Sequence, residues 1–130
     1  MKRKIAIASD HGGFSYKQAI QNHFEDYDWL DLGTDSTESV DYPDFAHEMA
    51  ERIRGGEVDT GILICGTGIG ISIAANRHPE VRSALCTDAT MARLTRQHNN
   101  ANVLALGERI IGLESVFDIV ETFLNTEFEG

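Results

Sequence analysis

Short apolar runs alternate with amphipathic stretches along the whole chain. Each apolar run has the length of a buried strand, and each stretch that follows repeats apolar residues at helical spacing. The sequence therefore predicts five strand–helix pairs. The expected strands are 4–8, 29–32, 61–65, 81–86 and 103–106, and the expected helices are 15–24, 42 to the glycines at 55–56, 71–78, 88–98 and 113–124.

This alternation predicts an α/β fold: a single-domain (1–130), three-layer Rossmann-like arrangement with a five-stranded parallel sheet covered on both faces. In open sheets of this kind, ligands bind outside the carboxyl ends of the strands. Polar residues follow every expected strand, at 10–11, 33–35, 65–67, 86–88 and 107–109. His98 and Asn99 fall at the opposite end of their helix, so they need another route to such a site.

Residues 59–76 hold the most informative pattern. A buried strand ends at Cys65, turns through Gly66-Thr67-Gly68-Ile69-Gly70 and enters a helix. Backbone amides in such a turn can hold a phosphate or an oxyanion, and the same surroundings can activate a thiol. The turn matches neither a Walker A loop nor the dinucleotide fingerprint. The other interpretation is that the glycines only allow the helix to pack closely on the strand.

Three further features carry chemistry or packing. Asp10 and His11 at a strand end could transfer protons, or they could be a helix cap and a surface imidazole. Tyr42 could be a packed aromatic or could direct its phenol at the site. Cys86 is expected in the core. No ligand spacing supports a metal site, and no nucleophile elbow supports a serine hydrolase.

Composition and charge exclude several classes of binding partner. The 130 residues carry a net charge of −10, which argues against nucleic acid or an anionic membrane as a partner. No apolar stretch approaches the roughly 20 residues that span a bilayer. The basic N-terminus lacks the pattern of a signal peptide, so we expect a cytoplasmic protein with free thiols.

Five motifs, in one order, resemble the ribose-5-phosphate isomerase B family. They lie at 9–13, 33–35, 40–44, 61–70 and 96–102, and the match runs in register over nearly the whole chain. The resemblance implies an aldose–ketose isomerase that interconverts ribose 5-phosphate and ribulose 5-phosphate through a cis-enediolate, without metal or cofactor. Members acting on allose 6-phosphate or galactose 6-phosphate are the alternative. A flavodoxin-like binding module is disfavoured, because the acids and lysine of a receiver domain are missing.

The resemblance also implies a role for each matching residue. Cys65 matches the general base, Asp10 a residue that handles hydroxyl protons, and His98 the group that opens the furanose ring. The enediolate oxygen would be held by Thr67 and by the amides of Gly66, Gly68, Ile69 and Gly70. His11 and Arg109 match phosphate contacts, and Tyr42 and Asn99 match contacts to sugar hydroxyls.

Assembly is the last implication of the resemblance. Family members form homodimers with shared active sites, in which the neighbouring subunit supplies the region from His98 to Arg109, and some pair further into tetramers. The family also carries a basic tail beyond the position where this sequence ends, at Gly130. Within these residues, phosphate binding would rest on His11 and Arg109, with Lys17 and Arg96 as further candidates.

Overall fold

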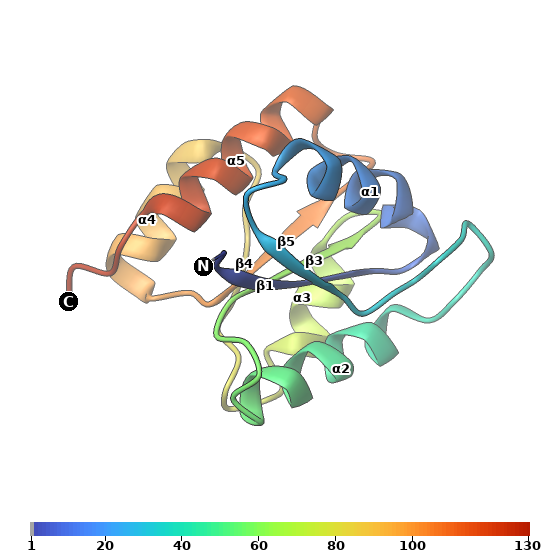
Figure 1. Cartoon of the computed structure of the whole chain (residues 1–130), viewed down its shortest axis with the longest axis horizontal. Helices are drawn as coiled ribbons and strands as arrows, with labels where there is room; N and C mark the ends of the chain where they lie inside the picture. The colour runs from blue at the N-terminus through green and yellow to red at the C-terminus, as the bar shows by residue number, and fades with distance from the viewer. Residues whose placement is uncertain (1) are drawn as a thin grey trace.

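The computed structural model describes residues 2–130 and contains one parallel sheet between two layers of helices (Figure 1). The strand order is β2-β1-β3-β5-β4. Among the described residues, no helix is long and apolar enough to cross a membrane. In chain order the elements are β1 (Lys4–Ser9), η1 (His11–Gly13), α1 (Phe14–His23), β2 (Asp28–Asp31), α2 (Tyr42–Arg54), β3 (Gly61–Cys65), α3 (Ile69–Ala75), β4 (Ser83–Leu85), α4 (Ala89–Asn99), β5 (Val103–Gly107) and α5 (Leu113–Asn125).

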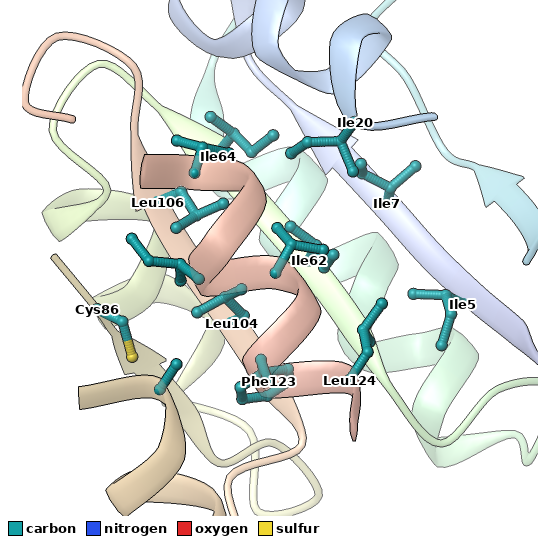
Figure 2. Close-up of a cluster of buried hydrophobic side chains, with 14 of the residues drawn as sticks. Ile5, Ile7, Ile20, Ile62, Ile64, Cys86, Leu104, Leu106, Phe123 and Leu124 are labelled. Atoms are coloured by element: carbon teal, nitrogen blue, oxygen red, sulfur yellow. The ribbon is translucent and has the colours of Figure 1, made fainter. Parts of the chain in front are cut away.

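The core has two halves, one on each face of the sheet. Successive strand residues point to opposite faces, so Ile62 and Ile64 pack under α1 and α5, whereas Leu63 and Cys65 pack under α2 and α3. Figure 2 shows the first half, with isoleucines and leucines of β1, β3 and β5 beneath α5. The expected Rossmann-like α/β fold is confirmed.

The sheet order places a topological switch point between two neighbouring strands. β1 leads into α1 on one face, and its neighbour β3 leads into α3 on the other face. Chains that leave in opposite directions at the carboxyl ends of adjacent strands create the crevice where ligands bind in such folds. The register places Ser9 opposite Ile64, and Cys65 opposite Gly107. The segments after β1, β3 and β5 therefore meet at one edge.

Two expected elements differ from the structure. β4 is only Ser83–Leu85, although the apolar run extends from Val81 to Cys86. Val81 and Cys86 are still buried, but they lie beyond the ladder of this edge strand. α3 begins at Ile69, two residues earlier than expected, because the glycine turn itself enters the helix.

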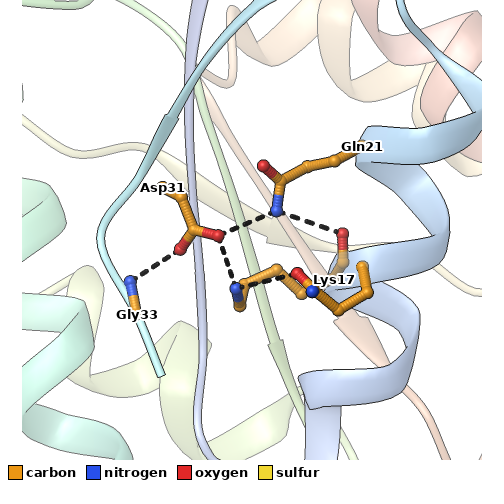
Figure 3. A network of polar contacts seen from close by, with 5 residues as sticks. Lys17, Gln21, Asp31 and Gly33 are labelled. Atoms are coloured by element: carbon orange, nitrogen blue, oxygen red, sulfur yellow. Dashed lines mark hydrogen bonds and ion pairs between the residues drawn. The ribbon is translucent and has the colours of Figure 1, made fainter. Parts of the chain in front are cut away.

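A buried lysine joins α1 to β2. The Lys17 side chain is 1% exposed, and its Nζ lies 2.6 Å from Oδ2 of Asp31 (Figure 3). Burial alone would raise the pKa of the Asp31 carboxyl. Hydrogen bonds from Lys17, Gln21 and the N–H of Gly33 outweigh that effect, so the pKa is lowered.

Replacing Asp31 with alanine is expected to lower the free energy of unfolding at pH 7 by about 2 kcal/mol, because it leaves the buried ammonium without its anion. The loss is no larger because the Asp31 carboxylate is partly exposed, so solvent screens the ion pair. Urea denaturation measures the change. Lys17→Met is the matched control, and it should cost less, because it removes the buried charge.

The contribution of the Lys17–Asp31 ion pair to stability depends on pH, because the pKa of Asp31 is lowered in the folded protein. The contribution is present above the pKa of an unfolded aspartate, about 3.9, and is lost as the pH falls through the lower pKa of the folded state. The difference between wild type and Asp31→Ala should therefore shrink at acid pH. A difference that grows there would contradict the assignment.

Candidate active site

The centre of the site is a thiol enclosed by its own turn. Cys65 ends β3 with 5% of its surface exposed, and its Sγ accepts a hydrogen bond of 3.1 Å from the N–H of Gly68. Gly68 has φ +80°, and a Cβ there would lie 2.6 Å from Cδ1 of Leu85. Only glycine fits this position, and it allows the chain to fold back over the sulfur.

The amides of the turn fall into two groups. The N–H of Gly68 is bound to the sulfur, and that of Ile69 donates to Oγ1 of Thr67 at 3.1 Å. Within residues 2–130, the N–H groups of Gly66, Thr67 and Gly70 have no acceptor. The unpaired amides can hold an oxyanion. The amides of Gly68 and Ile69 are also expected to do so; here they donate within the turn, and their role toward a ligand stays a prediction.

Tyr42 lies directly on this turn. A Cβ at Gly70 would be 2.6 Å from Cζ and 2.8 Å from Oη of Tyr42, so glycine at position 70 admits the phenol. The ring is 39% exposed and borders a hollow of about 210 Å³ that His47 and Ile73 also line. The sequence left open whether this ring is packed or aimed at the site. The structure shows it packed on Gly70, and a contact of its phenol with a ligand stays a prediction.

Asp10 and His11 follow β1, in the segment that lies next to the turn. Oδ1 of Asp10 accepts the N–H of Gly12 at 2.9 Å, so the expected cap is present. A Cβ at Gly12 would lie 3.2 Å from the N of Gly66, which shows how closely the two segments approach. Nδ1 of His11 lies 3.2 Å from both backbone polar atoms of Val40. Its Nε2 therefore remains available for a ligand.

Arg109 reaches the turn from the end of β5. Its N–H donates to the carbonyl of Gly66 at 2.9 Å, and a Cβ at Gly66 would lie 3.5 Å from Cδ and Nε of Arg109. Arg109 thus lies beside the glycine turn of its own chain. The pairing of β5 with β3 brings it here, and the implication that a neighbouring subunit supplies the region from His98 to Arg109 stays a prediction.

Other expected residues lie elsewhere. His98 and Asn99 are exposed in the last turn of α4, at the edge of the sheet away from Cys65, as the sequence indicated. Lys17 is bound to Asp31. Arg96 donates to the carbonyls of Thr126 and Ala101 at 3.0 and 2.7 Å. Lys17 and Arg96 are therefore structural side chains, and neither is brought to the turn as a phosphate contact.

The second thiol is confirmed as a core residue. Cys86 is 1% exposed, and burial, with a smaller effect of the Asp88 carboxylate, raises the pKa of its thiol to about 12. A thiol in this state is inert at neutral pH.

Sequence reasoning missed two residues: Tyr16, assigned only to a helix face, and Glu108, noted only as a residue after a strand. An acid directly after a strand is the one signal that could have pointed to Glu108.

Known proteins are similar to this chain in sequence and in fold. The family model described as Ribose/Galactose Isomerase matches residues 5–130. Ribose-5-phosphate isomerase B of Escherichia coli is 48% identical over 130 residues, covering 98% of this chain and 87% of the relative. A ribose 5-phosphate isomerase structure from Thermotoga maritima superposes with a TM-score of 0.97 at 52% identity, covering 100% and 91% of the two chains.

A third comparison includes a ligand. Ribose-5-phosphate isomerase B of Mycoplasma genitalium, with bound ribulose 5-phosphate, superposes with a TM-score of 0.92 at 42% identity, covering 100% of this chain and 88% of that one. The matches therefore extend over sequence, fold and nearly full length. This chain belongs to the ribose/galactose isomerase family.

Proposed function

We propose that this protein interconverts ribose 5-phosphate and ribulose 5-phosphate through a cis-enediolate. The observation that carries the proposal is the enclosed Cys65 thiol beside unpaired amides, with Asp10 directly after the neighbouring strand β1. Proton transfer next to a carbonyl needs a base and fixed donors where negative charge develops. The relative from M. genitalium binds ribulose 5-phosphate, which supports the substrate class.

In this mechanism Cys65 moves one proton. Its thiolate removes the proton from C2 of the open-chain aldose, and the resulting thiol returns a proton to C1. The charge that develops on the enediolate oxygen is stabilised by the amides of Gly66 and Gly70. Asp10 moves protons between the sugar hydroxyls; one of its carboxylate oxygens accepts the N–H of Gly12.

The phosphate and hydroxyl contacts surround this centre. Arg109, whose side chain lies beside Gly66, and Nε2 of His11 bind the phosphate. Tyr42, packed on Gly70, binds a sugar hydroxyl. Tyrosine and arginine here supply hydrogen bonds of fixed direction, which is how a site selects between sugars that differ by one carbon.

A homodimer completes the site, with His98 and Asn99 of one subunit reaching the turn of the other. Two observations support this assembly. His98 is exposed and lies away from the turn of its own chain. In addition, Ile69 and Ile73 of α3 are 51% and 62% exposed, and exposed apolar side chains beside a site are typical of a surface that a partner covers.

A coupled isomerase assay on the purified protein tests the proposed function. Ribose 5-phosphate should give a higher kcat/KM than allose 6-phosphate or galactose 6-phosphate by about tenfold or more, because one misplaced carbon moves the reacting carbons away from the thiol. A preference for either hexose phosphate would contradict the substrate. Absence of turnover on all three would favour a binding module.

A further inference from the structure

A pair of hydrogen bonds joins the start of α1 to the loop after β5. Oε1 of Glu108 accepts the N–H of Tyr16 at 2.9 Å, and the hydroxyl of Tyr16 donates to the carbonyl of Ile111 at 2.7 Å. The partners are 92 and 95 residues apart in sequence. We call these two bonds the Tyr16–Glu108 clasp. No part of the mechanism above uses either side chain.

Glu108 acts as a helix cap supplied from another element. Gly13, at the N-cap of α1, has no side chain to accept an amide of the first turn. The carboxylate of Glu108 accepts one of these amides and places negative charge at the positive end of the helix. The same residue donates its backbone N–H to the carbonyl of Cys65 at 3.0 Å. Glu108 therefore touches both α1 and the strand that carries the thiol.

The clasp joins the two segments that carry the phosphate contacts of the proposed site. α1 follows Asp10 and His11 through the short η1. The loop from Gly107 to Ile111 carries Arg109, whose side chain lies beside Gly66. Among residues 2–130, these two bonds are the side-chain hydrogen bonds that link α1 to this loop. A shift of one segment against the other would change the distance between His11 and Arg109.

We propose that Glu108 and Tyr16 are positioning residues that set the spacing of His11 and Arg109 for the phosphate of the substrate. The inference rests on the proposed function, because that function makes these two side chains phosphate contacts. The clasp touches neither the reacting carbons nor the thiol. Its loss should therefore weaken binding of the phosphate and leave the chemical step nearly unchanged.

Glu108→Ala and Tyr16→Phe test the proposal. Each should raise KM for ribose 5-phosphate by about tenfold and change kcat by less than about twofold, because uniform binding is lost. The inhibition constant of inorganic phosphate should rise by a similar factor. Glu108→Gln keeps an acceptor for the Tyr16 amide, so its KM should return to within about threefold of wild type.

Asp88→Ala is the matched control. The Asp88 carboxylate accepts the N–H of Met91 at 2.8 Å, so it caps α4 as Glu108 caps α1. Its removal should lower the melting temperature about as much as Glu108→Ala, while KM stays near wild type. Equal losses of melting temperature with unchanged KM and phosphate inhibition in Glu108→Ala would overturn the proposal.

Two further outcomes are separable. If Glu108→Ala does not fold, Tyr16→Phe decides, because it removes one hydroxyl and leaves the cap in place. If the wild type turns over no sugar phosphate, the proposed function fails. Calorimetric titration with inorganic phosphate then still tests the clasp: weaker binding by Glu108→Ala and Tyr16→Phe supports it, and equal binding refutes it.

Discussion

Replacing Cys65 with alanine is expected to lower kcat on ribose 5-phosphate by about a thousandfold, with KM nearly unchanged, because general-base catalysis by one positioned group contributes about 10²–10⁴ in rate. The sulfur is the one group of the turn that can accept the C2 proton. The unpaired amides of Gly66 and Gly70 remain and still bind the oxygen. Steady-state kinetics and solvent proton exchange at C2 both measure the loss.

The matched control is the other thiol. Cys86→Ala removes a buried sulfur of the same size from the opposite half of the core. It should cost about 1 kcal/mol of stability and leave kcat within about twofold of wild type. Circular dichroism and melting curves establish that both variants are folded. A Cys65→Ala protein that keeps more than about a tenth of wild-type kcat would assign the base to another residue.

Mixing two inactive variants is expected to restore activity. Cys65→Ala and His98→Ala each remove one component of the site, and each alone should fall to about 1% of wild-type kcat or below. In a shared site, a heterodimer holds one centre in which both native residues meet. Random pairing makes half of the dimers mixed, with one of two sites intact, so about a quarter of wild-type activity should return.

The two possible sources of His98 give opposite results. If His98 and Cys65 of the same chain formed the site, every centre in the mixture would lack one of them, and no activity would return. Refolding the two variants together supplies the mixed dimers, and refolding each alone is the control. A mixture no more active than its components would refute the shared site.

The fold could be predicted because it depends on periodicity within short segments. The run from Gly61 to Cys65 consists of apolar residues and glycine, which predicts a buried strand, and the structure places β3 at those residues. The alternation of strands and helices then leaves few arrangements. β4 was the exception. It is shorter than its apolar run, because an edge strand pairs on one side only and ends where its pairing with β5 ends.

The turn and the strand ends beside it were located for the same reason, but the side-chain contacts between them were not. Contacts of Tyr42 with Gly70, and of Arg109 with Gly66, join residues 28 and 43 positions apart. The spacing of apolar residues within a short segment cannot predict contacts between residues so far apart in sequence. Lys17 shows the opposite error. The sequence offered this cation as a phosphate contact, but in the structure its ammonium is paired with Asp31. Sequence patterns identify the reactive types, and packing decides which of them are free.

The glycine turn leaves no space for side chains at two of its positions. A side chain at Gly68 would collide with Leu85, and one at Gly70 would collide with Tyr42. The floor of the site is therefore fixed in shape, whatever sugar lies on it. Descendants of this protein that gained a longer or shorter substrate would have to change the rim, in the loop at 32–41 or at Gly107–Ile111. Substrate range can then evolve while the proton-transfer step stays the same.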